Sequence, residues 1–383
     1  MTIKNIGIIG STGSIGTQAV DVILRNRDLF NVVFLSCHSN TKLLEQQIKL
    51  LKPKVAVATS GKVTKFIIEG TKIYASKEDL NKIILNESID IILSSAVGFS
   101  GLEPTYLATK KGVNVALANK ESIVTGGDIL IPLAKKSGSN IIPVDSEHSA
   151  IYQSLMGQKK EYLKSITLTA SGGPFRKRPG DSLVYASVEE TLKHPNWSMG
   201  AKITVDSATM MNKGLELVEA KYLFDVNPEM LKVLIHPESI VHSFVSFIDG
   251  SSIAQMGLPD MRSAISFALG FPERIISGVP PLDLSRISKL TFYEPDLQKY
   301  KCLSLALDVL KTGSNKLLTV MNAANEVAVE LFLKKCIKFT DIPELVERTV
   351  FEFPQEVVLS IDEILRTDML AREKTYKIYN NYY

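Results

Sequence analysis

Short apolar runs alternate with amphipathic stretches along the first 147 residues of the chain. The apolar runs have the length and branched side chains of buried strands, and the stretches between them, such as 16–27 and 41–51, are long enough for crossover helices. Strands joined by such helices form a parallel, doubly wound α/β sheet of the Rossmann type, which we expect over residues 1–147. The pattern predicts its strands at residues 5–9, 32–35, 55–58, 89–93, 113–116 and 141–144.

From residue 148 the pattern changes to an alternation of polar and apolar positions. It predicts strands at 165–170 and 201–205, and a hairpin over 241–256 that turns at Asp249 and Gly250. We therefore expect residues 148–270 to form an α+β domain on a mixed or antiparallel sheet. One face of this sheet would carry Phe244, Phe247 and Ile253, which favours self-association into a homodimer.

Four prolines between residues 272 and 295 interrupt a stretch without clear periodicity, which is typical of a surface linker. We assign this linker to residues 271–294. The last segment, 295–383, has apolar positions at helical spacing over 303–311, 317–335, 342–353 and 360–379. It is therefore predicted to be a small helical bundle.

Composition narrows the class of protein. The 383 residues are 45% hydrophobic and 22% charged, and the net charge of +3 is too small for a nucleic-acid-binding surface. No uncharged apolar run reaches the roughly 18 to 20 residues that span a bilayer. Strand-like sequence begins close to Met1, so we expect a cytoplasmic protein without a membrane partner. The spacing of Cys37, Cys302 and Cys336 disfavours a disulfide framework or a zinc knuckle.

A glycine-rich turn follows the first predicted strand and leads into a helix. Gly10 and Gly13 permit a tight turn in which backbone N–H groups approach a pyrophosphate, and Gly16 lets the helix pack closely on the strand. Nucleotide binding is the leading interpretation, and a merely tight loop is the alternative. The predicted cofactor-binding residues of this turn are Gly10, Ser11, Thr12, Gly13, Ser14, Ile15 and Gly16.

The end of the second strand lacks the acidic residue that usually binds the ribose hydroxyls of NAD. Ser39, Asn40 and Lys42 stand there instead, and without a carboxylate a 2′-phosphate is not repelled. This favours NADP over NAD. The alternative is an ordinary helix start with Ser39 or Asn40 as its cap.

Two carboxylates follow the last predicted parallel strand. The i, i+2 spacing of Asp145 and Glu147 would put both side chains on one side of an extended backbone, at the sheet edge where ligands bind. Hard oxygen ligands suit Mg²⁺ or Mn²⁺. His148 has no second His or Cys nearby to make a zinc site, and a solvated strand end is the alternative for the whole motif.

A candidate third carboxylate is Glu216. Asn212, Lys213 and Glu216 fall on one helical face, which can bind an anion and a cation together, and Ser207 lies near the helix start, where N–H donors favour phosphate. The alternative is a capped helix with surface ion pairs. Ser171, in a Gly- and Pro-containing loop, is another candidate phosphate ligand.

Residues 194–200 contain Trp197, the one tryptophan of the chain, between Pro195 and Gly200. An exposed tryptophan is costly unless it covers something, so we interpret this loop as a lid. The alternative is that Trp197 packs in the core.

Six motifs, in this order, closely resemble the 1-deoxy-D-xylulose 5-phosphate reductoisomerase family. They are Gly-Ser-Thr-Gly-Ser-Ile-Gly (10–16), Ala-Asn-Lys-Glu-Ser (118–122), Pro-Val-Asp-Ser-Glu-His (143–148), Ser-Gly-Gly-Pro-Phe-Arg (171–176), His-Pro-Asn-Trp-Ser-Met-Gly (194–200) and Asn-Lys-Gly-Leu-Glu (212–216). The resemblance extends into the helical tail, at Met-Asn-Ala-Ala-Asn-Glu (321–326).

The resemblance implies an NADPH-dependent oxidoreductase that converts 1-deoxy-D-xylulose 5-phosphate, a sugar phosphate, into 2-C-methyl-D-erythritol 4-phosphate for isoprenoid synthesis. Asp145, Glu147 and Glu216 would hold the divalent cation, and with Lys120 they would be the catalytic residues. Asn119 and Glu121 would join the cofactor site. The implied substrate-binding residues are Lys120, Ser146, Glu147, Ser171, His194, Trp197, Met199, Ser207, Asn212, Lys213 and Glu216.

Three rival functions are weaker. A semialdehyde dehydrogenase needs a nucleophilic cysteine in its second domain, and residues 148–301 contain none. A regulatory nucleotide-binding module would not need three carboxylates beside a phosphate pocket, and a metal-dependent phosphosugar lyase would leave the first domain idle. Ser39 also departs from the family, several members of which carry Lys or Arg there, so the strength of the NADPH preference stays open.

Overall fold

The computed structural model describes residues 2–61, 70–197 and 199–382, which form two compact units. The first unit comprises Met1–Ser122, Leu130–Ser149 and Asp260–Pro280, and the second comprises Ile123–Ile129, Ala150–Pro259 and Pro281–Tyr383. Each unit is therefore assembled from several stretches of sequence. The four consecutive domains that we expect from the sequence stay a prediction.

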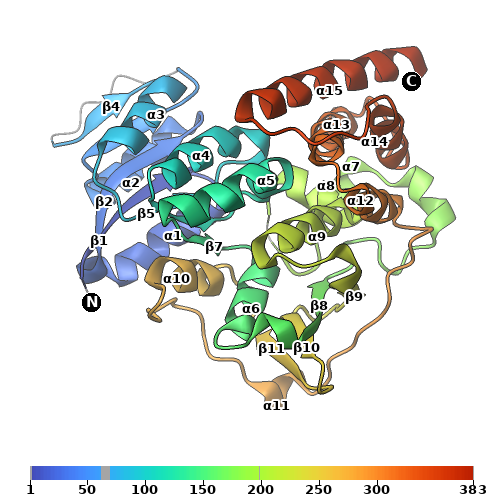
Figure 1. The fold of residues 1–383 in the computed structure, drawn as a ribbon, viewed down its shortest axis with the longest axis horizontal. Helices are drawn as coiled ribbons and strands as arrows, with labels where there is room; N and C mark the ends of the chain where they lie inside the picture. Colours follow the sequence, from blue (N-terminus) through green and yellow to red (C-terminus); the bar gives the residue numbers. More distant parts are fainter. Residues whose placement is uncertain (1, 62–69, 198, 383) are drawn as a thin grey trace. The chain divides into compact units, whose positions relative to one another are not determined.

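The first unit is built on a seven-stranded sheet in the order β4-β3-β2-β1-β5-β6-β7, in which every pair of neighbours is parallel (Figure 1). The predicted doubly wound α/β sheet is confirmed. The strand order reverses between β1 and β5, and ligands of such sheets bind at that point, beyond the carboxyl ends of the strands. The strands are β1 (Lys4–Ile9), β2 (Phe30–Cys37), β3 (Val55–Ala58), β4 (Lys72–Tyr74), β5 (Ile91–Ser94), β6 (Asn114–Leu117) and β7 (Ile141–Pro143).

Helices α1 to α4 connect these strands or follow them, and α10 comes from a distant part of the sequence. α10 is held on α1 because the Arg262 guanidinium donates to Asp21, at 3.0 Å. The Lys4 ammonium donates to the carbonyl oxygens of Leu269 and Gly270, where α10 ends. The helices are α1 (Ser14–Arg25), α2 (Thr41–Leu51), α3 (Lys77–Asn86), α4 (Leu102–Lys110) and α10 (Arg262–Gly270); α5 (Lys120–Ser137) and α6 (Ser146–Leu155) contribute residues to both units.

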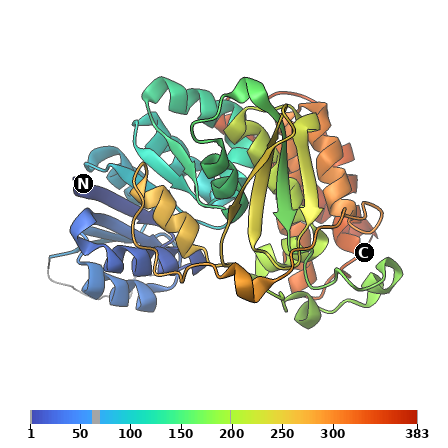
Figure 2. The same cartoon turned by 90° about the horizontal axis from the view of Figure 1, so that it is seen from below.

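The second unit contains a mixed four-stranded sheet in the order β11-β10-β8-β9. β8 and β9 are parallel, whereas β10 is antiparallel to both β8 and β11. The predicted hairpin is confirmed, with Gly250 at a φ of +86° in its turn. Figure 2 shows the strands side by side, with C-terminal helices on one side of the sheet. The strands are β8 (Leu163–Ala170), β9 (Leu231–Ile235), β10 (Val241–Phe247) and β11 (Ser252–Met256).

One predicted strand is wrong. Residues 201–205 are not extended but begin helix α8 (Ala201–Thr209). The β-branched residues Ile203, Thr204 and Val205 favour a strand locally. In the fold, Thr204, Val205 and Ala208 are buried at helical spacing, because α8 packs against α9 (Met211–Phe224) and α13 (Asn315–Leu333). Tertiary packing therefore overrides the local preference.

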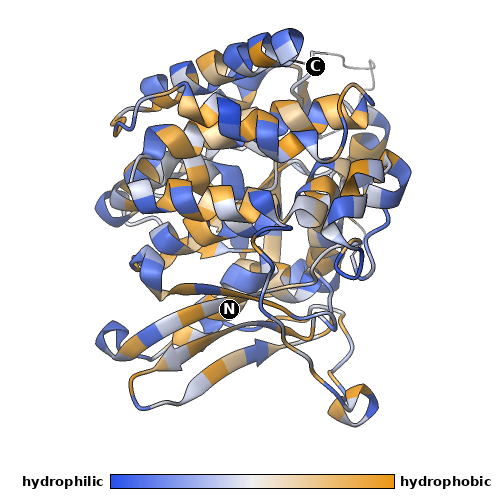
Figure 3. Cartoon of the chain, turned by 90° about the vertical axis from the view of Figure 1, so that its right-hand side faces the viewer, coloured by the Kyte–Doolittle hydropathy of each residue, from blue (hydrophilic) through white to orange (hydrophobic). Residues whose placement is uncertain are grey.

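The four predicted C-terminal helices are confirmed, with ends shifted by a few residues. Figure 3 shows hydrophobic and hydrophilic positions alternating around these helices, as their sequence pattern predicts. In α15, for example, Ile364, Ala371 and Ile378 lie seven residues apart on the buried face. Beyond α13, these helices are α12 (Lys301–Thr312), α14 (Asp341–Phe351) and α15 (Ile361–Tyr382).

The predicted linker, 271–294, contains one short helix, α11 (Leu284–Ile287), and α7 (Val188–Thr191) is another short helix of the second unit. None of the helices in the described part of the chain is long and apolar enough to cross a membrane. Single 3₁₀ turns complete the structure at Arg27–Leu29, Gly98–Gly101, Lys160–Tyr162, Gly180–Tyr185 and Pro228–Met230.

Candidate functional site

The glycine-rich turn lies directly between β1 and α1, at the point where the strand order reverses. Gly10 has a φ of +80°, and a Cβ atom there would lie 2.7 Å from the carbonyl oxygen of Ser95. A Cβ atom at Gly16 would lie 2.3 Å from the carbonyl oxygen of Gly10. Both positions therefore require glycine, and the chain can turn tightly enough for backbone N–H groups to surround an anion.

The first turn of α1 offers its N–H groups to a ligand. Gly13 is the N-cap residue, and among the described residues no side chain caps this helix. The N–H groups at a helix start have no partner within the helix, and the helix dipole favours a negative charge there. The Ser11 hydroxyl also stabilises the turn, because it is buried and donates to Gln47 Oε1 at 2.7 Å. Thr12, Ser14 and Ile15 lie in the same turn, partly or fully exposed.

The end of β2 carries the candidate ribose contacts. Ser39 and Asn40 are both exposed, and Asn40 caps α2, since its Oδ1 atom accepts a hydrogen bond from the N–H of Leu43 at 3.2 Å. The alternative interpretation of Asn40 as a helix cap is thus confirmed. Capping uses only the side-chain oxygen, so the Asn40 amide group and the Ser39 hydroxyl are compatible with a ligand at the same position.

Asn119 organises the start of α5. Its Oδ1 atom accepts from the N–H of Ser122 at 3.0 Å, and its Nδ2 atom donates to the carbonyl oxygens of Ala96 and Gly98 at 2.9 and 2.8 Å. Nδ2 also lies 3.1 Å from Glu121 Oε2. Asn119 is 1% exposed. Through these hydrogen bonds its side chain joins the loops after β5 and β6, and so fixes the position of Lys120 and Glu121.

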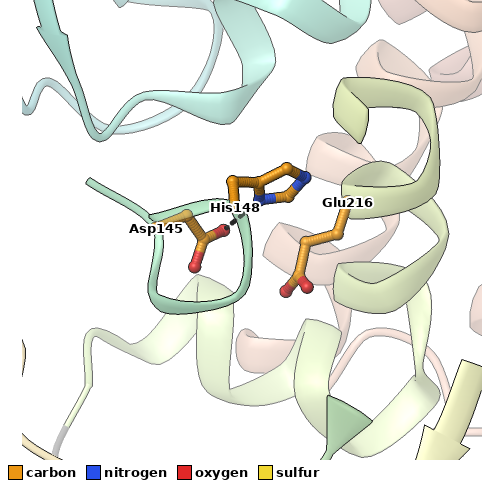
Figure 4. A group of neighbouring side chains, drawn as sticks. All are labelled: Asp145, His148 and Glu216. Carbon is orange, nitrogen blue, oxygen red and sulfur yellow. Dashed lines mark ion pairs between the residues drawn. The ribbon is translucent and has the colours of Figure 1, made fainter. Parts of the chain in front are cut away.

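Lys120 and Asp145 form a nearly buried ion pair in the first unit, with 2.7 Å between Nζ and Oδ2. His148 adds a second nitrogen, its Nδ1 atom lying 3.8 Å from the same carboxylate oxygen. Figure 4 shows Asp145 before α6 and His148 on that helix, joined by the ion pair, and it also draws Glu216 on α9 of the second unit.

The predicted geometry of Asp145 and Glu147 is wrong. The extended backbone ends at Pro143, and α6 begins at Ser146, so Glu147 lies in the first turn of a helix. Ser146 donates its hydroxyl proton to Glu147 Oε2 at 2.5 Å. A helix start favours a carboxylate through the dipole of the helix, which the sequence pattern alone did not reveal.

In the second unit, Ser171 and His194 are hydrogen-bonded, with 2.9 Å between Oγ and Nε2. The Nδ1 atom of His194 accepts from the N–H groups of Asn196 and Trp197, at 3.2 and 3.0 Å. Burial, with a smaller effect from the positive charge of Arg176, lowers the pKa of His194 from 6.5 to about 4. The imidazole is therefore neutral at physiological pH, and the proton on Nε2 points to Ser171.

The predicted lid holds Trp197 and Met199, both half-buried. The Trp197 ring lies 6.3 Å from the ring of His242, between centroids, and Asn196 Nδ2 donates to the carbonyl oxygen of Pro237 at 2.7 Å. Trp197 is thus neither fully exposed nor in the core. Ser198, part of the same motif, lies outside the described residues, and closure of the loop stays a prediction.

Helices α8 and α9 meet at Met210, which has a φ of +61° and so ends one helix and starts the next. Ser207 lies in the last turn of α8. A Cβ atom at Gly173 would lie 2.8 Å from the Ser207 carbonyl oxygen, so the loop that begins at Ser171 passes directly against the backbone of Ser207. The fold therefore brings the predicted phosphate ligands Ser171 and Ser207 onto adjoining backbone segments.

Asn212, Lys213 and Glu216 form a compact cluster on α9. Asn212 Nδ2 and Lys213 Nζ each lie 2.5 Å from one of the two carboxylate oxygens of Glu216. Lys213 is 3% exposed and Glu216 is fully buried. The alternative interpretation as surface ion pairs is wrong. A buried ion pair stabilises a fold poorly because of its desolvation, which favours a functional role for this one.

Two residues near these sites had no role in the sequence-based prediction. Arg176 lowers the pKa of His194, and His242 faces the Trp197 ring. Arg176 ends the Ser-Gly-Gly-Pro-Phe-Arg motif, so the sequence could have identified it as a site residue. His242 lies in a strand outside all six motifs, so nothing in the sequence indicated it.

Family models match most of the chain. The model for 1-deoxy-D-xylulose 5-phosphate reductoisomerase matches residues 6–127. The model for the C-terminal domain of the same enzyme matches residues 141–224, and the model for the DXP reductoisomerase C-terminal domain matches residues 256–374. The chain belongs to the 1-deoxy-D-xylulose 5-phosphate reductoisomerase family.

The chain is similar to members of this family over nearly its full length. The 1-deoxy-D-xylulose 5-phosphate reductoisomerase of Geobacter metallireducens is 46% identical over 380 residues, which cover 98% of this chain and 99% of that protein. A crystal structure of DOX-P reductoisomerase with NADPH, fosmidomycin and magnesium has 38% identity and a TM-score of 0.92, covering 99% of this chain and 98% of the other. The enzyme from Zymomonas mobilis in complex with NADPH has 35% identity and a TM-score of 0.90, covering 99% of each chain. The fold class predicted from the sequence is confirmed.

Proposed function

We infer that the chain converts 1-deoxy-D-xylulose 5-phosphate into 2-C-methyl-D-erythritol 4-phosphate, with NADPH as reductant and a divalent cation. Family membership supports this activity. The observation that carries it in this chain is the cluster of half-buried Asn212 with buried Lys213 and Glu216. This cluster follows Ser207 by five residues and presents an amide, an ammonium and a carboxylate together.

Phosphate binding is assigned to Ser171, Ser207, Asn212 and Lys213, bordered by His194. Ser171 Oγ accepts a hydrogen bond from the neutral imidazole of His194 at 2.9 Å and from the N–H of Gly173 at 3.2 Å. Because the lone pairs of this hydroxyl are occupied by two donors, its own proton is available for a phosphate oxygen. Lys213 adds positive charge in a buried setting, where electrostatic attraction is strong.

Asp145, Glu147 and Glu216 are assigned to the divalent cation. Carboxylate oxygens are the ligands that Mg²⁺ and Mn²⁺ prefer, so the donor set fits such an ion. The ion pairs of Lys120 with Asp145, at 2.7 Å, and of Lys213 with Glu216, at 2.5 Å, support this assignment, because each carboxylate already accepts a positively charged neighbour. When bound, the cation supplies Lewis-acid polarisation of the substrate carbonyl.

Lys120 and Ser146 are assigned to the substrate hydroxyls. Lys120 is 6% exposed, and its ammonium lies 2.7 Å from Asp145. The ion pair holds this proton donor in one position, so little conformational entropy is lost when the substrate binds. Trp197 and Met199 are assigned to the lid, which excludes water from the reacting groups.

NADPH binding is assigned to Gly10, Ser11, Thr12, Gly13, Ser14, Ile15 and Gly16, with Ser39, Asn40, Asn119 and Glu121. The glycines and the open start of α1 receive the pyrophosphate, and the exposed Ser39 and Asn40 receive the ribose end. The bound dinucleotide supplies the hydride for the reduction.

The test is an assay of the purified chain with 1-deoxy-D-xylulose 5-phosphate, NADPH and Mn²⁺. We expect oxidation of the nicotinamide, followed at 340 nm, in equal amount to the formation of 2-C-methyl-D-erythritol 4-phosphate, identified by mass spectrometry. Omission of the metal, by chelation, should stop both. Folded protein that forms no product under these conditions would contradict the proposal. Consumption of the substrate without NADPH, giving cleavage products instead of 2-C-methyl-D-erythritol 4-phosphate, would favour a lyase.

A homodimer and a location in the cytoplasm stay predictions from the sequence. The exposed Ile253 of β11, an edge strand, supports self-association through the second sheet, whereas Phe247 is buried and therefore not available for it. Sedimentation equilibrium of the full chain measures the oligomeric state directly.

A further inference from the structure

The Met-Asn-Ala-Ala-Asn-Glu motif at 321–326 has no role in the function described so far. It lies in α13, and Asn322 and Asn325 are both fully buried. The Oδ1 atoms of both amides have no hydrogen-bond partner among the described residues. A buried amide with an unsatisfied oxygen costs stability relative to an apolar side chain of similar size. Packing alone therefore does not explain these two asparagines.

The one hydrogen bond of the Asn325 side chain in the described structure goes to Asp206 on α8. Asn325 Nδ2 donates to Asp206 Oδ1 at 2.8 Å, across 119 residues of sequence. The other oxygen of this carboxylate, Oδ2, lies 2.8 Å from Lys202 Nζ, one turn earlier on α8. Asp206 is 1% exposed, so its carboxylate is held from two sides in a site where hydrogen bonds to a charge are strong.

Asp206 immediately precedes Ser207, a phosphate ligand under the proposed function. The carbonyl oxygen of Asp206 accepts from Thr209 Oγ1 at 3.3 Å, and Thr209 Oγ1 accepts from the N–H of Met211 at 3.3 Å. This chain of hydrogen bonds spans the break at Met210 and reaches the start of α9, on which Asn212 and Lys213 lie. Asp206 thus anchors the backbone that carries three of the four predicted phosphate ligands.

We propose that Asn325 is a positioning residue for the substrate phosphate: through Asp206 it fixes Ser207 and the α8–α9 junction in the conformation that binds the phosphate group. This inference rests on the proposed function. It gives the C-terminal helical segment a part in substrate binding, because α13 supplies the only donor to Asp206, among the described residues, from outside α8.

The test compares Asn325→Ala with Asn322→Ala, a matched control. Asn322 is equally buried on the same helix, but its amide donates to Glu326 at 3.3 Å and not to Asp206. Titration calorimetry of inorganic phosphate into the chain with NADPH and Mg²⁺ measures phosphate affinity without turnover. We expect Asn325→Ala to weaken phosphate binding roughly tenfold, as the loss of one hydrogen bond to a charged group predicts. NADPH affinity should stay unchanged, and Asn322→Ala should bind phosphate like the wild type.

Turnover gives a second readout. Asn325→Ala should raise the KM for 1-deoxy-D-xylulose 5-phosphate more than it lowers kcat. If Asn325→Ala does not fold, the isosteric Asp206→Asn variant decides by the same criteria. Unchanged phosphate affinity, or an equal loss in Asn322→Ala, would overturn the positioning role. A wild-type chain that binds phosphate but shows no turnover contradicts the proposed function instead, so the two failures are distinguishable.

Discussion

The Nε2 atom of His194 lies 2.9 Å from the Oγ atom of Ser171, while both N–H groups that reach the other ring nitrogen come from the backbone of residues 196 and 197. This arrangement fixes the tautomer of His194, because Nδ1 must be an acceptor and Nε2 the donor. The Ser171 hydroxyl is consequently oriented before any ligand binds. The same loop that forms the predicted lid thus also orients a phosphate ligand.

Ser171→Ala should weaken substrate binding. The variant removes one hydrogen bond to the phosphate, so we expect the KM for 1-deoxy-D-xylulose 5-phosphate to rise about tenfold, with a smaller change in kcat. Steady-state kinetics measure both. Ser165→Ala is the matched control, since Ser165 is a buried serine of β8, the strand that ends just before Ser171, and it has no predicted ligand contact. An unchanged KM in Ser171→Ala would remove this residue from the phosphate site.

The lowered pKa of His194 predicts an acid-sensitive fold. The pKa of His194 is about 4 in the folded chain and 6.5 in an ordinary setting, chiefly because of burial. As the pH falls from 6.5 to 4, the unfolded chain therefore binds a proton that the folded chain does not, and the free energy of unfolding decreases. Urea denaturation across this range should show a smaller decrease for His194→Gln than for the wild type. Equal slopes for the two proteins would contradict the low pKa.

Glu216→Gln should abolish turnover and destabilise the second unit. The substitution leaves the ammonium of Lys213, 3% exposed, without its carboxylate, and loss of one partner of a buried pair costs about 3–5 kcal/mol. The double variant Lys213→Met/Glu216→Gln removes both charges and should recover most of the free energy of unfolding. It should nevertheless stay inactive, while NADPH binding, measured by nucleotide fluorescence, persists. Turnover in the double variant would argue against Glu216 as a cation ligand.

Ser39→Asp should shift the cofactor preference from NADPH to NADH. The exposed Ser39 follows β2, where a carboxylate would bind the ribose hydroxyls of NADH and repel the 2′-phosphate of NADPH. We expect the ratio of kcat/KM for NADPH to that for NADH to fall at least about tenfold, the equivalent of 1.4 kcal/mol. Lys49→Gln, an exposed position further along α2, tests whether any change of charge has this effect. A ratio that does not move would place the 2′-phosphate elsewhere.

Gly16→Ala should damage the nucleotide site more than Gly13→Ala. A Cβ atom would lie 2.3 Å from the Gly10 carbonyl oxygen at position 16, and 3.3 Å from it at position 13. Backbone must move in the first case, which costs about 1–3 kcal/mol, whereas a shift of a few tenths of an ångström suffices in the second. Thermal unfolding and NADPH titration of both variants check this order. Equal effects of the two substitutions would mean that close helix packing at Gly16 is not what the turn requires.

The sequence alone determined the first sheet and its nucleotide turn. The six predicted strands of the first segment all exist, because buried parallel strands are continuous apolar runs and need no partner to be recognised. The strand that the sequence did not predict, β4, has only three residues, with an exposed-intermediate-exposed burial pattern. It therefore contains no apolar run by which it could be recognised. The glycine turn was also predictable from the sequence, since the steric requirement at Gly16 acts against Gly10, six positions earlier, whereas the close approach of Ser95 to Gly10 is visible only in the fold.

Only the tertiary structure decided the rest. Residues 201–205 become helical because α9 and α13 bury one face of α8. Glu147 lies on a helix because β7 ends at Pro143, one residue earlier than the apolar run suggests, and α6 begins at Ser146. The ion pair of Lys213 and Glu216 is buried because other segments cover α9, which the sequence of α9 does not encode. The hydrogen bond from Asn325 to Asp206 joins residues 119 positions apart, so no local pattern predicts it. Local pattern encodes periodicity and turns, whereas burial and long-range partners arise only when separate segments pack together.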